Sequence, residues 1–296
     1  MDNVRGSFLM VIAMLGFAVE DMFIKQMSGA LPVGQIILIL GLGGGVVFAA
    51  IGMLRKDAMW SRDLIHPAVV ARTLCEMIGS VAFVTALSRI DLSVASAILQ
   101  AAPLVVTAGA ALFLGETVGW RRWAAIAVGF VGVMFVLRPG LEGFQPNALW
   151  AVLGVVGLGA RDLLTRLIPK SVTSVQISTY SFLSLVPAGL IAMLLVGDTF
   201  ASPDRTDTLR LIAAVVIGIA AYYAVVGATR LGDVSVVSPF RYSRMVFALI
   251  VGALAFAERP DLLTILGAAI IIGSGFFSIW REARFRRASH HANAAL

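Results

Sequence analysis

The chain has 296 residues, of which 59% are hydrophobic and only 14% charged, and its mean hydropathy is +0.93. Soluble domains carry about 25% charged residues, so this composition excludes a soluble fold. The net charge of +6 lies mainly in short loops beside the apolar runs, without interleaved aromatic residues, and this excludes a nucleic-acid-binding protein.

Ten apolar runs are long enough to cross a hydrocarbon core of roughly 30 Å. Because a helix satisfies its own backbone hydrogen bonds in lipid, these runs predict an all-α integral membrane protein. The first run continues into Glu20 and Asp21 without a cleavage site, so we expect a retained span and not a signal peptide. The predicted spans are 7–27, 33–54, 67–88, 93–115, 121–138, 147–168, 173–197, 209–229, 234–256 and 261–280.

The basic residues predict the orientation of these spans. With the N-terminus inside, the inner segments hold 13 lysines and arginines and the outer loops hold five. Cytoplasmic loops carry such an excess, and ten spans return the chain to its starting side. We therefore expect a multi-pass protein of the bacterial inner (cytoplasmic) membrane with both termini in the cytoplasm.

The segment 91–116, DLSVASAILQAAPLVVTAGAALFLGE, recurs as DVSVVSPFRYSRMVFALIVGALAFAE in 233–258. Seven of 26 positions are identical at a constant offset of 142, and 16–25 matches 157–166 at an offset of 141. Each unit holds five spans, an odd number, so the two copies must cross the membrane in opposite senses. We predict ten transmembrane helices as two inverted five-helix repeats around a central cavity. The repeats are 1–140 and 141–281, followed by a cytoplasmic polar tail, 282–296.

Both copies of the repeated segment begin and end with polar residues. Asp91–Ser93 and Asp233–Ser235 have the composition of helix N-caps for the fourth and ninth spans. An acid, Glu116 or Glu258, closes each copy. We expect these residues to lie at the two surfaces of the membrane.

Nine charged residues lie inside the predicted spans, and each costs about 2.5–3.5 kcal/mol near the bilayer centre. Most of them must therefore pair, line water or lie near span ends; Lys25 is expected to reach the interface by snorkelling. The nine are Glu20, Asp21, Lys25, Arg72, Glu76, Arg161, Asp162, Arg241 and Arg244.

Two of these charges are four residues apart on the third span. Arg72 and Glu76 can meet on one helix face, either as a self-neutralising pair or as a pair that lines the cavity. Two others, Glu20 and Arg161, are opposite charges at equivalent positions of the two repeats. They are expected to approach each other across the pseudo-two-fold axis, as a gate, a substrate clamp or a structural pair. Asp21 and Asp162 lie beside them.

The fourth and ninth spans each contain a proline, Pro103 and Pro239. A proline removes a backbone donor and frees a carbonyl one turn earlier. Discontinuous helices of this kind form binding sites at the midplane of transporters, although an ordinary kink is the alternative. Gln100 and its equivalent Tyr242 lie close to these positions and are candidate binding residues.

Arg241 and Arg244 are three residues apart and have no acid nearby in the sequence. Their guanidinium groups suit an anionic group such as a carboxylate, so we place at least one of them in the cavity. Tyr222 and Tyr223 in the eighth span are candidates for an aromatic lining, with membrane packing as the alternative.

The doubled five-span unit, the segment AILQAAPLVVTAGAALFLGE (97–116), the repeated acid Glu116/Glu258 and GAAIIIGSG (267–275) resemble the drug/metabolite transporter superfamily, in its ten-span EamA-type exporter branch. The resemblance covers the whole chain and implies a cavity lined by spans 1, 3, 4, 6, 8 and 9, with spans 5 and 10 peripheral. Met245 stands where the family pattern has a proline, and Pro239 comes earlier.

These features predict an exporter of small metabolites, namely amino acids, that works by alternating access, and the resemblance implies aromatic and other neutral amino acids. The alternative is a proton-coupled exporter of lipophilic cationic drugs, and a non-transporting receptor or scaffold is the third hypothesis. An enzyme is not expected, because GxSxG and HExxH are missing and no histidine lies in a span. The single cysteine, Cys75, excludes a thiolate metal site. We expect no cofactor, and a monomer or weak homodimer in the lipid bilayer.

Overall fold

The computed structural model describes residues 2–57, 59–116, 118–140 and 144–293, with 234–235 and 279–293 described by their backbone alone. The elements are α1 (Asp2–Met27), α2 (Val33–Leu54), η1 (Arg62–Ile65), α3 (Pro67–Arg89), α4 (Leu92–Leu99), α5 (Ala102–Phe113), α6 (Trp120–Leu137), α7 (Ala148–Thr165), α8 (Ser174–Val196), α9 (Arg205–Leu231), α10 (Val234–Val237), η2 (Ser238–Tyr242), α11 (Ser243–Phe256) and α12 (Leu262–Asn293). Within the described ranges every element is helical, as predicted.

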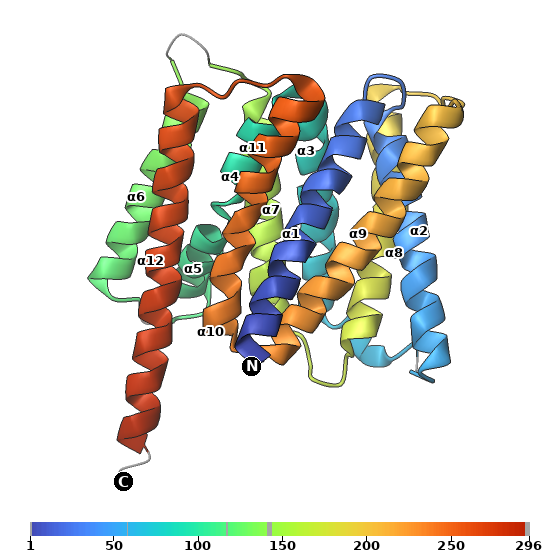
Figure 1. Cartoon of the computed structure of the whole chain (residues 1–296). Coiled ribbons are helices and arrows are strands. Elements are labelled where there is room, and N and C mark those ends of the chain that lie inside the picture. The colour runs from blue at the N-terminus through green and yellow to red at the C-terminus, as the bar shows by residue number, and fades with distance from the viewer. Residues whose placement is uncertain (1, 58, 117, 141–143, 294–296) are drawn as a thin grey trace.

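Nine stretches of helix in the described residues are long and apolar enough to cross a membrane. A tenth apolar stretch, Leu262–Ser278 at the start of α12, is shorter over the residues whose side chains are described. The backbone of α12 continues to Asn293, through most of the predicted polar tail, whose residues 294–296 lie outside the described residues. The helix α1 begins, and α12 ends, at the same end of the bundle (Figure 1). We call this end the terminal face and the other end the opposite face.

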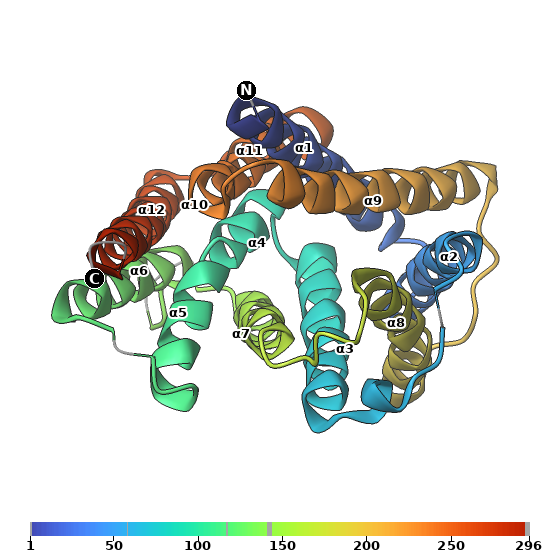
Figure 2. The same ribbon diagram turned by 90° about the horizontal axis from the view of Figure 1, so that it is seen from below.

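Helix pairing follows the repeat. The helix α1 packs along α9, and α3 packs along α7. Because α1 is the repeat equivalent of α7, and α3 that of α9, each of these pairs is the counterpart of the other. The helices α2 and α8 pack on each other, as do α6 and α12, and these are pairs of direct equivalents. Figure 2 shows α6 and α12 side by side at one edge of the bundle, the peripheral position expected for spans 5 and 10.

The fourth span is interrupted near its centre and the ninth span nearer its start. The fourth consists of α4 and α5, separated at Gln100 and Ala101, and Pro103 lies in the first turn of α5. The ninth passes from α10 through the 3-10 turn η2, which begins with Ser238 and Pro239. A proline in a first turn loses no internal hydrogen bond, so both prolines mark helix starts. The predicted discontinuity is therefore present in both repeats, although the ninth span breaks without a proline at Met245.

An exposed ion pair joins α6 to the start of α12 at the opposite face. Asp261 accepts a hydrogen bond from the N–H of Thr264 (3.0 Å) and pairs with Arg138. Hydrogen bonding by Arg138 lowers the pKa of Asp261 to about 2. A depressed folded-state pKa contributes stability above the unfolded value of about 4 that is lost as the pH falls towards 2.

Replacing Asp261 with alanine is expected to remove this cap and cost about 1 kcal/mol at neutral pH. The difference in thermal midpoint between D261A and the unaltered protein should shrink as the pH falls from 4 to 2. Thermal unfolding of detergent-solubilised protein across that range measures it. A difference that stays constant down to pH 2 would contradict the role assigned to the Asp261 carboxylate.

Candidate substrate site

Four charged side chains from α3 and α7 form one ionic cluster inside the bundle. Arg161 donates to Glu76 (Nη1 to Oε1, 2.8 Å) and pairs with its neighbour Asp162 (Nη2 to Oδ1, 2.7 Å). Arg72 lies 3.3 Å from Glu76 (Nη2 to Oε2), so the predicted pair forms. The Glu76 carboxylate thus has two cationic partners. The negative charge of Glu76 and the positive charge of Arg161 are thus both paired inside the bundle, where an unpaired charge would be costly.

Polar residues that the sequence did not single out extend this cluster to α8. Arg72 Nε donates to the Thr165 hydroxyl (3.1 Å), and its Nη1 donates to the hydroxyl of Ser181. Ser181 belongs to a run of buried hydroxyl residues on α8, which includes Ser178. The sequence did contain a signal for this contact: hydroxyl residues spaced along one face of a membrane span often form hydrogen bonds to a neighbouring helix.

A second, separate ion pair connects α1 to α11. Arg244 Nη2 lies 2.6 Å from Oδ2 of the buried Asp21. The guanidinium carbon also lies 5.1 Å from the ring centroid of Phe17 and 5.7 Å from that of Phe83, distances typical of cation–π contacts. Arg244 is therefore held by a carboxylate and two rings, although the sequence offered it no local acid.

The predicted approach of Glu20 to Arg161 does not occur. Arg161 is taken by Glu76 and Asp162, while Glu20 lies on α1 against Gly218 of α9. The physical reason is the helix pairing: α1 packs on α9 and α7 on α3, so equivalent residues of α1 and α7 face different partners. Among the described residues, Glu20 has no hydrogen bond or ion pair, and the charges that act on it are Asp21 and Arg244.

Arg241 and Gln100 meet where the two interrupted spans come together. Gln100 Nε2 donates to the main-chain carbonyl of Arg241 (3.5 Å), which links the break in the fourth span to that in the ninth. The side chain of Arg241 is exposed and acts electrostatically on Asp162, without a hydrogen bond to any described residue. Tyr242 instead directs its hydroxyl towards Gly275 of α12, on the peripheral side.

A cavity opens at the terminal face between α2, α8 and α9. Its volume is about 100 Å³, and its walls include Phe48, Ser178, Tyr222 and Tyr223. Tyr222 packs edge-on against the ring of Phe48 (5.2 Å between centroids) and shares a hydrogen bond with Ser178 (2.9 Å). Two basic residues at the helix ends, Arg55 and Arg230, complete the lining.

This cavity includes α2 and α8, which the resemblance did not place in the lining. Ser178, in its wall, lies one helical turn from Ser181, which binds Arg72 of the ionic cluster. Space of 100 Å³ is smaller than the 300–1,000 Å³ of typical small-molecule sites, so the cavity in this conformation holds at most a small part of a substrate.

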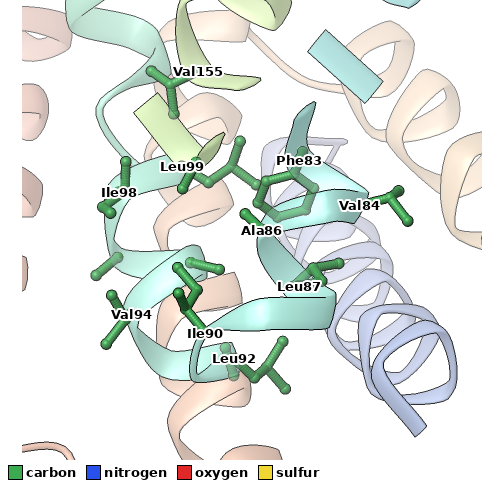
Figure 3. Packing of buried hydrophobic residues seen from close by; sticks show 14 of the residues in the cluster. Phe83, Val84, Ala86, Leu87, Ile90, Leu92, Val94, Ile98, Leu99 and Val155 are labelled. Atoms are coloured by element: carbon green, nitrogen blue, oxygen red, sulfur yellow. The ribbon is translucent and has the colours of Figure 1, made fainter. Parts of the chain in front are cut away.

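At the opposite face the bundle is closed by apolar packing and by one carboxylate. The end of α3 and the start of α4 are filled by Leu87, Ile90 and Leu92, all at most 4% exposed (Figure 3). Glu258, beyond α11, accepts hydrogen bonds from the N–H groups of Leu92 (2.6 Å) and Ser93 (3.0 Å) and from the Ser93 hydroxyl (2.8 Å).

Glu258 therefore caps α4 from the other repeat, and this corrects the prediction that Asp91 and Ser93 cap it themselves. The side chain of Asp91 makes no cap hydrogen bond, and that of Asp233 is engaged by Asn3. Lys25, in the last turn of α1, lies at the same place: its Nζ donates to the carbonyls of Leu87 and Ile90 and lies 3.8 Å from Oε1 of Glu258.

Glu116, the repeat equivalent of Glu258, behaves differently at the terminal face. The backbone is the same in both places: the preceding residues, Gly115 and Ala257, are both left-handed. The Glu116 side chain is nevertheless 41% exposed and pairs with Arg166 (3.0 Å), whereas that of Glu258 is 4% exposed. The two equivalent acids thus differ in burial and in partners, although the backbone before them is alike. The buried acid is the one at the opposite face.

Two consecutive parts of the chain, residues 4–138 and 145–280, each match the model of the EamA-like transporter family. Together they cover most of the sequence and divide it into two halves, as the repeat predicts. The chain belongs to the EamA-like transporter family. It is therefore a multi-pass membrane transporter of small molecules and not an enzyme.

Curated relatives within the EamA-like family transport different compounds. The chain is 25% identical to the S-adenosylmethionine uptake transporter of Rickettsia felis, over 78% of this chain and 77% of the relative. It is 28% identical to the riboflavin transporter of Rhizobium johnstonii, over 96% and 94%. It is 27% identical to the pseudopaline exporter CntI of Pseudomonas aeruginosa, over 90% and 93%.

A solved crystal structure shares the fold of this EamA-like chain. The TM-score is 0.58 and the identity 19%, over 89% of this chain and 94% of the other. This similarity shows the common helical architecture.

Proposed function

We propose that this protein exports small metabolites, namely neutral and aromatic amino acids, by alternating access. The observation that carries the proposal is which charges within the spans are paired and which are not. Most of them satisfy one another, but the carboxylate of Glu20 and the guanidinium of Arg241 have no hydrogen bond to a described residue. A zwitterionic substrate carries one group of each sign and offers a partner to each of these two residues.

Relatives that transport S-adenosylmethionine and pseudopaline, by their names, support a substrate of this general kind. The whole chain also resembles the bacterial inner-membrane amino-acid exporter YddG, which is associated with aromatic and other neutral amino acids. From the distribution of basic residues we also propose the membrane orientation: the terminal face lies in the cytoplasm and the opposite face lies outside.

Alternating access would exchange the roles of the two ends. In the described conformation the opposite face is closed by Glu258 and the terminal face contains the cavity. Because the repeats are inverted, the complementary conformation would close the terminal face by the equivalent acid, Glu116, and release Glu258. With the terminal face inside, the described conformation is the one that receives substrate from the cytoplasm.

Arg241 is proposed to bind the carboxylate of the substrate, because Arg244 is already held by Asp21. Replacing Arg241 with glutamine is expected to raise the KM for amino-acid transport about tenfold, the loss of roughly one charge-assisted hydrogen bond. Uptake by liposomes containing the purified protein measures this. The matched control, Arg89→Gln at the exposed end of α3, should leave KM within about twofold. Equal effects of the two variants would contradict the assignment.

The substrate class is tested by counterflow. Liposomes preloaded with an unlabelled amino acid should accumulate labelled phenylalanine, and several neutral amino acids should compete. The proposal fails if no amino acid is exchanged or competes.

The unpaired Glu20 carboxylate also favours the second candidate, a proton-coupled exporter of lipophilic cations. An embedded acid that titrates during turnover is what such coupling needs. Transport of a lipophilic cation driven by an imposed pH gradient would support this candidate, and transport indifferent to the gradient would count against it.

A further inference from the structure

Residue contacts define how the two repeats correspond. Gly157 of α7 lies against Gly79 of α3, so closely that a side chain would collide. In the other half, Gly16 of α1 lies in the same way against Ala221 of α9. Gly16 and Gly157 differ by 141 in sequence, and Gly79 and Ala221 differ by 142, the two offsets of the repeat. The contact between α7 and α3 is therefore reproduced between α1 and α9.

The same correspondence compares the charged residues one turn away. Arg161 of α7 is equivalent to Glu20 of α1, and Glu76 of α3 is equivalent to Gly218 of α9. Arg161 meets Glu76 at 2.8 Å, and Glu20 meets Gly218, whose missing side chain leaves room for the carboxylate. At one position of the repeat an ion pair is complete; at the equivalent position the acid is present and its partner is missing.

Among the described residues, no neighbouring group forms an ion pair with Glu20. Arg244 is the cation that acts on Glu20, but it donates its hydrogen bond to Asp21 and lies between the rings of Phe17 and Phe83. Glu20 is half-buried, so its carboxylate is partly accessible while it lies within a membrane span. An isolated carboxylate there is unfavourable, and a bound cation neutralises it as a proton does.

We propose that Glu20 is the subsite for the positively charged group of the substrate, an ammonium or a related onium group. This inference rests on the proposed transport function. It assigns binding of the positively charged group to one acid, where the sequence offered several candidates. Glu76 and Asp162 are excluded because arginines already occupy them, and Asp21 because Arg244 does. Gly218 contributes by leaving the carboxylate free of a side chain on α9.

The two proposed substrate contacts, Glu20 and Arg241, belong to different repeats. Glu20 lies on α1 and Arg241 on η2, and these two elements pack against each other. The cationic and anionic groups of a substrate would thus bind to neighbouring elements from the two repeats. Movement of one repeat against the other would then change both contacts together.

The test uses the purified full-length protein in liposomes and three compounds of the same skeleton. Phenylalanine carries both charges, phenethylamine only the ammonium, and phenylpyruvate only the carboxylate. Glu20→Gln is expected to raise the half-saturating concentrations of phenylalanine and phenethylamine roughly ten- to a hundredfold. Competition by phenylpyruvate should change less than about twofold. Asp198→Asn, at an exposed acid outside the helices, is the matched control and should change none of the three.

A second variant separates recognition from folding. Glu20→Arg combined with Gly218→Glu copies the Arg161–Glu76 pair into the other half. We expect this double variant to have a thermal midpoint at least as high as Gly218→Glu alone, and to take up neither amine. Retention of phenethylamine uptake by the double variant would overturn the inference.

The outcomes distinguish this inference from the proposed function. If phenylalanine is transported and Glu20→Gln impairs all three compounds equally, the cation subsite is overturned while amino-acid transport stands. If the unaltered protein takes up phenethylamine but no amino acid, and Glu20→Gln abolishes that uptake, the subsite stands and amino-acid export fails. If neither amine is taken up, both are overturned.

Discussion

Replacing Arg161 with methionine is expected to lower the stability of the protein by about 3 kcal/mol, the lower end of the cost of removing one partner from a buried ion pair, because Arg161 is partly exposed. Arg161 binds Glu76 at 2.8 Å and Asp162 at 2.7 Å, and it joins α7 to α3. Its loss leaves Asp162 with no hydrogen-bonded cation and halves the positive charge around Glu76. The thermal midpoint of the detergent-solubilised protein measures the effect.

A matched control and a rescue variant test the cause. Arg166→Met removes an arginine from an exposed pair on the same helix end, which contributes about 0–1 kcal/mol, so its midpoint should change little. Adding Asp162→Asn to Arg161→Met should recover part of the loss, because the unpaired charge is then gone. Equal midpoints for Arg161→Met and Arg166→Met would show that the cluster does not hold the helices together.

Replacing Glu258 with alanine is expected to open the opposite face. Its carboxylate accepts three hydrogen bonds from Leu92 and Ser93, and bonds to a charged group contribute about 1.5–3 kcal/mol each. Loss of only one such contribution from the closed state shifts its equilibrium with the open state on the order of ten- to a hundredfold. Transport should fall as well, because the closed conformation would be scarce.

A cysteine introduced at Ala95 reports on this opening. Ala95 is fully buried in the first turn of α4, and Cys75→Ser removes the natural thiol. Labelling of Ala95→Cys by a membrane-impermeant maleimide added at the opposite face should be slow, and at least tenfold faster with Glu258→Ala. Glu116→Ala, the repeat-equivalent change, is the control and should not accelerate it. Unchanged labelling with Glu258→Ala would contradict closure by this residue.

The charged residues and their one local pair follow from the sequence, but the pairs between helices do not. Arg72 and Glu76 were predicted to pair because four residues on one helix bring side chains together, and they do. Glu20 and Arg161 were expected to meet because they are repeat equivalents, and they do not. Symmetry identifies which positions correspond; it does not say which helices touch.

The Glu258 cap shows the same limit. Its equivalence with Glu116 was visible in the sequence, but hydrogen bonding to Leu92 and Ser93 joins residues more than 160 positions apart. A local N-cap by Asp91 was the expectation from neighbouring residues alone. The donors at the start of α4 are satisfied by whichever acceptor the tertiary fold brings there, and that is a carboxylate of the other repeat.

The sequence by itself determined the class of the protein: apolar runs of membrane-spanning length, an odd unit written twice, and prolines where two spans break. These follow from local composition and period, because each helix must satisfy its backbone in lipid on its own. Only the tertiary structure decided the pairing of α1 with α9 and of α3 with α7. It thereby decided which charges are neutralised and which, like Glu20, are left available, because Coulomb energy depends on distances between helices that the order of residues along the chain does not contain.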